Sequence, residues 1–481
     1  MNLPNRFAGR MREYFSADTE SDADAFFRSF SEPSVYGVRL NRLKVPCERD
    51  AAILSSMGIE NDSVPWCPSG YYVDDKVSGN DPYSHSGVFY QQEPSAMLPA
   101  EILAAEPGER VLDLCAAPGG KTTRIAEMLR GEGLLIANDI SSDRCRALLR
   151  NLERMGIDDA VILNETPERL ADRFEDFFDK ILIDAPCSGE GMFRRDPSAM
   201  KSWERYGVEI TVKMQREILI RADRMLRPGG SIVYSTCTFS EEENEQTAEW
   251  FMSNCPGYEI VAHPAVPEVS FSCVAGDTNG AIRIWPHRSR GEGHFCVHMR
   301  KSGDKKINIE GDDYSKFGHS YDTGLIVPAC VTSFFKGLLT ADAADRLLDR
   351  LRRYGFITHD RLHFHSMPDV LYHKLRAVKI GAYCGNLKNV SDRAVFVPSS
   401  SFASMIKGED IRPERLISLD RTDNRVERYL KGETVFMSIE EAQRLEDRAY
   451  IVIAVDGFPL GFAKHSDRVL KNQYPKSWRV L

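Results

Sequence analysis

Short apolar runs alternate with longer amphipathic segments between residues 108 and 235. The short runs predict strands and the amphipathic segments predict helices, because burial repeats every second residue in a strand and about every 3.6 residues in a helix. This alternation indicates an α/β fold, a doubly wound parallel sheet with helices on both faces. Strands are expected at 110–114, 134–139, 160–163, 180–184 and 231–235, and helices at 122–129, 142–155 and 208–226.

The flanking segments follow other patterns. Apolar residues at helical spacing in 22–30 predict a small helical leader, and the Pro, Gly, Asn and Asp residues of 61–82 predict a linker. The charged stretch 301–315 is the expected boundary after the sheet. Asp456-Gly457 between two apolar runs predicts a hairpin. Four domains are therefore expected, at 1–84, 85–303, 316–410 and 411–481.

The composition, 42% hydrophobic and 28% charged in 481 residues, is that of a globular protein. A membrane span is excluded because no apolar run approaches about 18 residues, and residues 1–15 lack the apolar core of a signal peptide. A cytoplasmic protein is therefore expected. The net charge of −9 argues against wholesale coating by nucleic acid but leaves local basic patches open.

No metal site or disulfide framework is expected. The eleven cysteines form no CxxC pair. The spacings of His359, His363, His365 and His373 match no strong ligand motif. The acidic run 241–243 with Glu245 is expected to start a helix, where acids suit the helix dipole, and to have no catalytic role.

Residues 111–122 (VLDLCAAPGGKT) end a strand with small side chains and then open a helix. Small side chains let a ligand approach the backbone, and the helix start offers free N–H groups. The segment is neither GxGxxG nor GxxxxGK[ST], so dinucleotide and P-loop sites lose their motif support. Asp139 ends the next strand, where an acid commonly holds ribose hydroxyls. A tight turn would explain the glycines alone; together with Asp139 they favour S-adenosylmethionine.

Two cysteines follow the ends of later strands. Asp184 and Cys187 come after the apolar run 180–184, and Cys237 comes after 231–235. Ligands of open parallel sheets bind at the carboxyl ends of the strands, so these residues are expected to converge on the cofactor loop. A cysteine at a strand end is usually a small buried hydrophobe. That interpretation is kept for the other cysteines but not for these two, which lie in Pro, Thr, Gly and Ser-rich turns.

A thiol, a carboxylate and a methyl sulfonium together fit methylation of a pyrimidine at carbon 5. Carbon 5 becomes nucleophilic when a thiolate adds to carbon 6. A carboxylic acid at ring nitrogen 3 would share the developing charge, so an Asp184 with a raised pKa would suit the reaction. The thiol then leaves by elimination, which a second thiol would assist.

Seven blocks of the chain resemble the Sun-type RNA (cytosine-5)-methyltransferases, in particular their bacterial branch acting on small-subunit ribosomal RNA. Their order and spacing extend over about residues 35 to 300. The blocks are 38–44, 87–95, 113–122, 184–193, 234–239, 283–287 and 291–295.

The resemblance implies a class I Rossmann-like methyltransferase that uses S-adenosylmethionine. Cys237 is then the nucleophile and Cys187 helps to release the product, while Asp184 and Lys121 contact the cytosine. Asp139 takes the ribose, and Arg144 is a further contact on the cofactor side. The implied cofactor residues are Cys115, Ala116, Ala117, Pro118, Gly119, Gly120, Lys121, Asp139, Arg144 and Asp184.

One departure lies after the third strand, where many relatives have an acid on the adenine side. This chain has Asn164, Glu165 and Thr166 there, and which of the three contacts the adenine side stays open.

The resemblance also implies a small N-terminal α/β region and a C-terminal PUA-like β-barrel that binds RNA. Arg39, Arg42 and Lys44 would add phosphate contacts on the opposite flank. Interleaved aromatic and basic residues suit stacking and phosphate contacts, although a packed barrel with ordinary surface lysines is the alternative. These residues are Phe462, Lys464, Arg468, Lys471, Tyr474, Lys476 and Trp478.

The leading hypothesis is an RNA cytosine-5 methyltransferase acting on 16S ribosomal RNA, and a monomer is expected because one chain carries every part of the site. A transfer RNA enzyme of the same family is the second hypothesis. A ribosome assembly factor without catalysis is the third, although such a binding module would need neither thiol.

Overall fold

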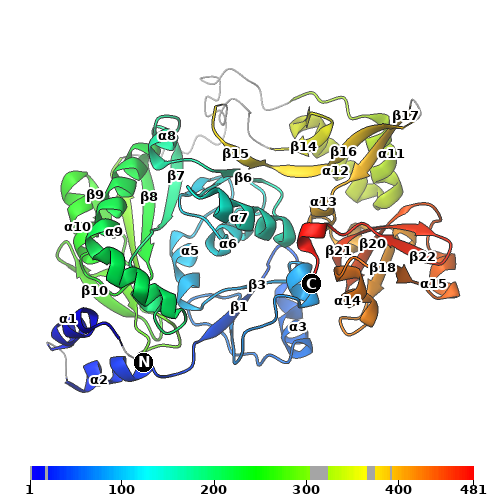
Figure 1. Ribbon diagram of the computed structural model, residues 1–481. Helices are drawn as coiled ribbons and strands as arrows, with labels where there is room; N and C mark the ends of the chain where they lie inside the picture. The colour runs from blue at the N-terminus through cyan, green and yellow to red at the C-terminus, as the bar shows by residue number, and fades with distance from the viewer. Residues whose placement is uncertain (1–2, 17–19, 304–322, 366–373, 391–392, 481) are drawn as a thin grey trace.

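The computed structural model describes residues 3–16, 20–303, 323–365, 374–390 and 393–480. A ten-stranded sheet forms its centre (Figure 1). Five parallel strands make up the middle of this sheet, as the alternation of apolar runs predicted. In spatial order they are β8 (Leu226–Thr236), β7 (Phe178–Asp184), β4 (Arg110–Asp113), β5 (Leu134–Asn138) and β6 (Ala160–Leu163).

Helices cover both faces of the parallel strands. Successive strand residues alternate between two hydrophobic cores, so that Val111 packs with the α6 side and Leu112 with the α9 side. This arrangement confirms the α/β doubly wound fold. One face carries α5 (Leu98–Leu103), α6 (Gly120–Leu129) and α7 (Ser142–Met155), and the other carries α8 (Pro167–Ala171), α9 (Pro197–Met225) and α10 (Glu245–Asn254).

Antiparallel strands extend the sheet at both edges. Beyond β8 lie β12 (His294–Lys301), β11 (Asp277–Ile284) and β10 (Ser270–Val274), and β9 (Tyr258–Ile260) also pairs with β12. At the other edge β15 (Ala377–Ile380) pairs with β6. A strand from the C-terminal third therefore extends the central sheet, which the sequence pattern did not predict.

The N-terminal region holds more than the predicted helical leader and linker. After α1 (Asn5–Phe15) and α2 (Glu20–Ser29), an antiparallel sheet forms in the order β2 (Gly70–Val73), β1 (Tyr36–Leu40), β3 (Phe89–Gln91). β2 lies within the predicted linker 61–82, and β3 lies beyond the expected boundary at residue 84. These strands have three to five residues, too few for a periodic pattern. Two further helices are α3 (Asp50–Ser56) and α4 (Pro82–His85).

The C-terminal third contains two smaller sheets. The first, after α11 (Ala329–Leu338) and α12 (Ala341–Tyr354), has the order β13 (Gly355–Thr358), β14 (Arg361–Phe364), β16 (Ala382–Val390), β17 (Arg393–Pro398). The second follows α13 (Ser400–Met405) in the order β18 (Leu416–Leu419), β20 (Tyr450–Val455), β21 (Phe458–Ser466), β22 (Val469–Asn472), β19 (Val435–Phe436), with α14 (Asn424–Leu430) and α15 (Ile439–Arg444). The hairpin predicted at Asp456-Gly457 is confirmed as β20–β21.

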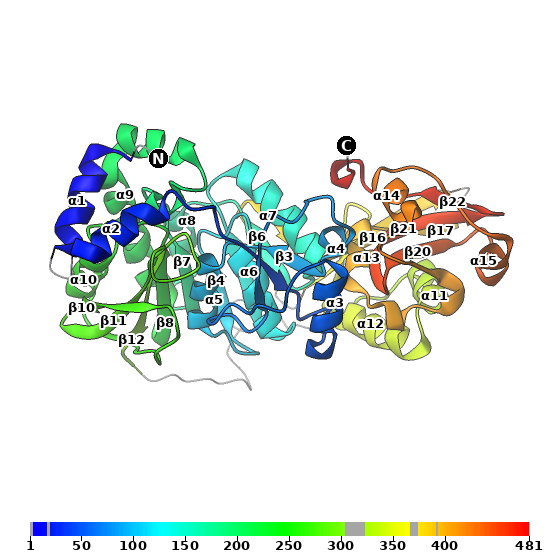
Figure 2. The same cartoon turned by 90° about the horizontal axis from the view of Figure 1, so that it is seen from below.

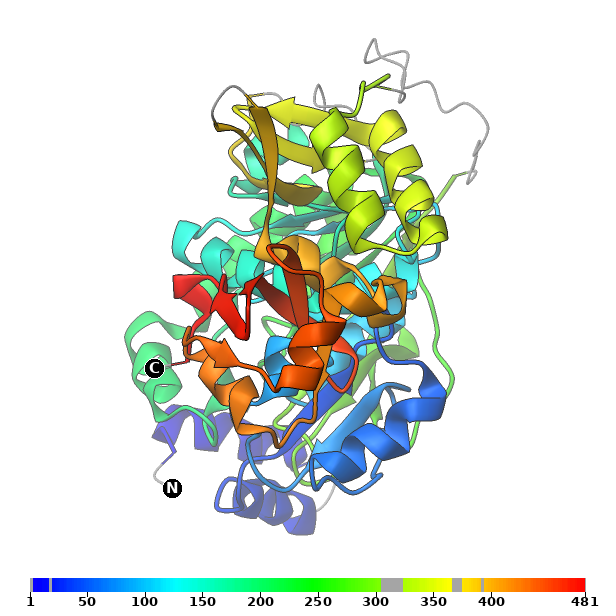
Figure 3. The same cartoon turned by 90° about the vertical axis from the view of Figure 1, so that its right-hand side faces the viewer.

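The C-terminal sheet and the N-terminal region share one hydrophobic core. The blue helix α3 lies beside the C-terminal domain in Figure 2 and Figure 3, whereas α1 and α2 lie at the opposite end of the molecule in Figure 2. Polar contacts cross this junction: Tyr83 donates a hydrogen bond to Asp456 at 2.6 Å, and His85 Nδ1 lies 2.7 Å from the Tyr474 hydroxyl. The part of the N-terminal region around α4 is therefore docked to the C-terminal domain. Residues 304–315 of the predicted boundary segment lie outside the described residues. In the part of the chain that the structure describes, no helix is long and apolar enough to cross a membrane.

The buried His85 makes this junction sensitive to acid. Burial and the nearby charge of Arg154 lower the pKa of His85 to about 4. In the unfolded chain this histidine is protonated below about pH 6.5, whereas in the folded chain it stays neutral down to about pH 4. We expect the free energy of unfolding to fall by roughly 3 kcal/mol from this group over that range. Urea unfolding at a series of pH values measures this dependence, and His85→Gln should make the free energy of unfolding depend less on pH between 6.5 and 4. The same pH dependence in the variant would contradict the role given to His85.

Candidate active site

The two cysteines that follow β7 and β8 lie side by side. Asp184 pairs with Ser235 in the parallel register of the two strands, so their carboxyl ends stop at the same level. The Sγ atoms of Cys187 and Cys237 are 3.4 Å apart. The loops after the two strands therefore converge as the sequence predicted, and both thiols are free and half-buried.

Asp184 forms the polar centre of the site. Lys121 Nζ donates to its Oδ2 at 2.7 Å, Ser235 Oγ donates to its Oδ1 at 3.1 Å, and His294 Nε2 lies 3.7 Å from Oδ1. Burial disfavours ionisation, but Lys121, His294 and the two hydrogen bonds together lower the pKa of Asp184. The expectation of a raised pKa was therefore wrong, because the lysine from the cofactor loop reaches this carboxylate.

The surroundings of Cys187 favour its protonated form. The hydrogen bond with Cys237 raises the pKa of Cys187, and burial and the nearby Glu243 add to this effect. Cys187 therefore holds its proton at neutral pH. A protonated Cys187 can donate a hydrogen bond to the sulfur of Cys237.

The cofactor loop, residues 115–121, joins the end of β4 to the start of α6. Gly119 has φ of 111°, in the left-handed region, and precedes the first helical residue. A Cβ on Gly120 would lie 3.0 Å from the Gln92 side chain and 3.1 Å from the Tyr90 ring, so a larger residue would crowd the N-terminal region that packs on the loop. The loop residues Cys115, Ala116, Ala117, Pro118, Gly119, Gly120 and Lys121 thus present backbone and small side chains at the helix N-terminus.

Arg144 connects the loop to the acid on the next strand. Its guanidinium donates to the carbonyl oxygen of Ala117 and lies 3.3 Å from Asp139 Oδ2. Asp139 is buried, and its Oδ1 accepts a hydrogen bond from Ser141 N at 2.9 Å. The structure therefore brings Asp139 and Arg144 to the edge of the cofactor loop.

The three residues after β6 have separate partners. Asn164 Nδ2 donates to the carbonyl oxygen of Asp139 at 2.8 Å, next to the predicted ribose acid. The carboxylate of Glu165 is fully buried and pairs with Arg169 and Arg376. Thr166 caps α8. Of the three, Asn164 lies nearest to the Asp139 backbone, while the side chain of Glu165 is engaged elsewhere.

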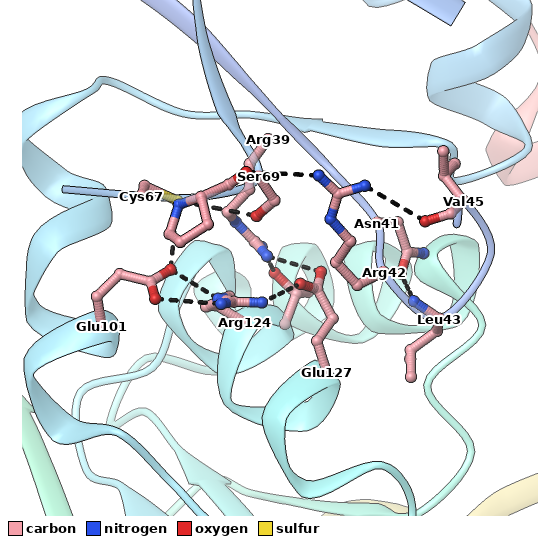
Figure 4. A network of polar contacts seen from close by, with 12 residues as sticks. Arg39, Asn41, Arg42, Leu43, Val45, Cys67, Ser69, Glu101, Arg124 and Glu127 are labelled. Carbon is pink, nitrogen blue, oxygen red and sulfur yellow. Dashed lines mark hydrogen bonds and ion pairs between the residues drawn. The ribbon is translucent and has the colours of Figure 1, made fainter. Parts of the chain in front are cut away.

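The predicted phosphate contact of Arg39 is wrong. Arg39 is fully buried, pairs with Glu127 on α6 at 2.6 Å and donates to the carbonyl oxygen of Gly120 at 3.1 Å. Figure 4 shows its guanidinium pointing to Glu127, which also pairs with Arg124. Arg39 therefore fastens the N-terminal sheet to the helix that starts at the cofactor loop.

Arg42 and Lys44 are also engaged inside the protein. Arg42 binds both carboxylate oxygens of Asp50 at 2.6 Å. Lys44 Nζ donates to the carbonyl oxygens of Ser86 and Arg154, and burial lowers its pKa to about 7. A basic pattern in sequence cannot distinguish a surface patch from internal pairs, because folding decides the partners: Asp50 is only eight residues from Arg42, whereas Arg154 is 110 residues from Lys44.

The predicted stacking surface of the C-terminal domain is largely internal. Phe462, Tyr474 and Trp478 are buried, and Tyr474 instead contacts His85. These aromatic rings pack the barrel and its junction, so bases cannot stack on them. The alternative of a packed barrel is correct for the aromatic residues.

Two buried glutamates shape the site and were missed from the sequence. Glu190 accepts hydrogen bonds from Trp203 Nε1 at 2.8 Å and from the backbone N–H of Phe239 at 3.1 Å. Glu243 accepts from the backbone N–H of Ser188 at 2.9 Å. It lies in the acidic run that was expected only to start a helix, whereas α10 begins at Glu245. The sequence feature that could have pointed to Glu243 is its position six residues after Cys237.

Comparison with known proteins agrees with this site. Family models match at residues 3–94 (N-terminal domain of 16S rRNA methyltransferase RsmF), 100–300 (16S rRNA methyltransferase RsmB/F) and 417–480 (methyltransferase RsmF PUA domain). Ribosomal RNA small subunit methyltransferase F of Klebsiella pneumoniae (strain 342) is 30% identical, over 98% of this chain and 96% of its own length. The chain belongs to the ribosomal RNA small subunit methyltransferase F family.

Other members and neighbours extend the comparison. The methyltransferase F of Shewanella amazonensis is 30% identical over 94% of this chain and 93% of its own length. A solved methyltransferase homolog from Pyrococcus horikoshii is 26% identical, with a TM-score of 0.50 over 62% of this chain and all of its own. NSun6 of the same organism, solved with SFG, shares the fold at 24% identity and a TM-score of 0.52, over 63% of this chain and 99% of its own. This methyltransferase F family member thus carries a Rossmann-like methyltransferase sheet and an RNA-binding PUA domain.

The Arg39–Glu127 pair should be a strong determinant of stability. Both side chains are 1% exposed, so Arg39→Met would leave a buried carboxylate with one partner fewer. We expect a loss of roughly 3 kcal/mol in the free energy of unfolding. Arg146→Met, which breaks an exposed pair with Asp143, is the control and should change it by less than about 1 kcal/mol. Equal effects in denaturant unfolding would contradict the role given to Arg39.

Proposed function

We propose that this protein transfers a methyl group from S-adenosylmethionine to carbon 5 of cytosine in RNA, with 16S ribosomal RNA as substrate. The observation that carries the proposal is the pair of thiols 3.4 Å apart beside Asp184 and Lys121. A binding module needs neither thiol, which argues against an assembly factor without catalysis.

The residues around the cofactor loop fit S-adenosylmethionine. The small side chains of residues 115–120 let a ligand approach the backbone at the start of α6. Asp139 offers a carboxylate to ribose hydroxyls, and Arg144 joins it to the loop. When bound, this cofactor supplies an electrophilic methyl group.

The chain's own groups provide nucleophile and release. Cys237 adds as a thiolate to carbon 6 of the cytosine, which makes carbon 5 nucleophilic. Cys187 keeps its proton because its pKa is raised. A protonated Cys187 can donate a hydrogen bond to a leaving thiolate, which supports Cys187 as the thiol that assists release and leaves the part of nucleophile to Cys237.

Asp184 and Lys121 would hold the target base. An ionised Asp184 accepts a hydrogen bond from the exocyclic amino group of cytosine, which uracil lacks. The Lys121 ammonium group stabilises the negative charge that develops on the ring after thiolate addition. The ion pair thus supplies both recognition and electrostatic stabilisation.

The relatives' names support ribosomal RNA of the small subunit as the substrate, and the PUA match supports RNA binding outside the catalytic sheet. We further propose that the chain acts as a monomer, with domains at 1–84, 85–303, 316–410 and 411–481; the pairings of β3 with β1 and of β15 with β6 join neighbouring domains across these boundaries. Transfer RNA is the second candidate substrate.

Substitution of the two cysteines separates addition from release. Cys237→Ala should abolish methylation while RNA binding persists, because the bond to carbon 6 cannot form. Cys187→Ala should accumulate a covalent RNA–protein adduct, seen as a denaturant-resistant band. An adduct from Cys237→Ala but none from Cys187→Ala would reverse the two roles.

Bisulfite sequencing of RNA from cells with and without the gene tests the substrate. We expect a protected cytosine in 16S ribosomal RNA to lose its protection when the gene is absent. Loss confined to transfer RNA would keep the chemistry and discard this substrate. No change at any cytosine would contradict the proposed activity.

A further inference from the structure

A buried polar cluster lies beside the two thiols, formed by Glu243, Ser188, Thr238 and Gln215. Glu243 is fully buried in the turn before α10. Its carboxylate accepts hydrogen bonds from the backbone N–H of Ser188 at 2.9 Å, from the Ser188 hydroxyl, and from Gln215 Nε2 at 3.0 Å. Three donors thus converge on one carboxylate.

This cluster holds the chain on both sides of Cys187. Ser188, the residue after it, is bound through its N–H and its hydroxyl to Glu243. Gln215 of α9 also donates to the carbonyl oxygen of Pro186, the residue before it, at 3.0 Å. Glu243 and Gln215 are joined to each other, so the turn that carries Cys187 is fixed to α9 and to the turn before α10.

The same cluster reaches the turn that carries Cys237. The Ser188 hydroxyl lies 2.8 Å from Thr238 Oγ1, and Thr238 directly follows Cys237. The Thr238 carbonyl oxygen accepts from Asn244 Nδ2 at 3.0 Å. The residues that follow the two thiols are therefore hydrogen-bonded to each other, in parallel with the 3.4 Å contact between the sulfur atoms.

A buried carboxylate at this position destabilises the fold unless hydrogen-bond donors compensate for its charge. Burying it costs free energy that only several well-aligned donors offset. As an acceptor without donors of its own, it fixes the direction of all three hydrogen bonds. We propose that Glu243 is a positioning residue that holds Cys187 against Cys237 and thereby sets the rate of product release; this inference rests on the proposed cytosine methylation.

Release explains why the distance between the thiols matters. The carbon 5–hydrogen bond breaks, its proton goes to water, and its electron pair forms the carbon 5–carbon 6 double bond. The carbon 6–sulfur bond breaks and its electron pair stays on the sulfur of Cys237. The thiol of Cys187 donates a hydrogen bond to that sulfur, which stabilises the leaving thiolate only at close range.

Glu243→Ala tests this role in a single turnover on small-subunit RNA from cells that lack the gene. We expect adduct formation to stay within about twofold of the wild type, while release slows about tenfold, which corresponds to about 1.4 kcal/mol. The denaturant-resistant band should therefore persist longer. Glu243→Gln should partly restore release, because its amide oxygen can still accept from the Ser188 N–H.

Glu241→Gln is the matched control, since this neighbouring acid is exposed and should leave both rates unchanged. If Glu243→Ala fails to fold, Thr238→Val removes the hydroxyl bridge at nearly constant volume and should slow release in the same way. Equal losses of adduct formation and release, or an unchanged release rate, would overturn the inference. Absence of adduct and methylation in the wild type would instead refute the proposed function.

Discussion

The parallel pairing of β7 with β8 is the constraint on which the site depends. It sets Asp184 opposite Ser235, so that two chain segments separated by about fifty residues end at the same edge of the sheet. The turns that follow then bring Cys187 and Cys237 to 3.4 Å. A shift of one residue in this register would turn Asp184 to the other face of the sheet and separate it from Lys121.

The rest of the molecule holds the cofactor loop against this strand pair. Arg39 ties the N-terminal sheet to α6 through Glu127 and the Gly120 carbonyl. The N-terminal region in turn shares a hydrophobic core with the C-terminal sheet, and β15 extends the catalytic sheet from the same third of the chain. The PUA domain is therefore docked on the N-terminal region, which Arg39 fastens to the helix that follows the loop.

The parallel core could be predicted from sequence because each of its strands is a short apolar run next to an amphipathic helix. β6 and α7 have the predicted bounds, since local pattern and burial agree there. The strands β1, β2, β3 and β15 were missed because pairing with distant segments, rather than local periodicity, forms them. The surroundings of charged side chains are equally hard to predict from local sequence. The burial of Arg39 and the pKa of Asp184 depend on partners far along the chain, Glu127 for Arg39 and Lys121 for Asp184.

The central claim is that Cys237 forms a covalent bond with the cytosine ring. RNA containing 5-fluorocytosine tests it most directly in the wild-type protein, because fluorine at carbon 5 cannot leave as a proton does and the adduct is trapped. Digestion and mass spectrometry of the trapped complex then identify the modified peptide. The account predicts the nucleotide on Cys237; its attachment to Cys187, or the absence of an adduct in a protein that methylates ordinary RNA, would contradict it.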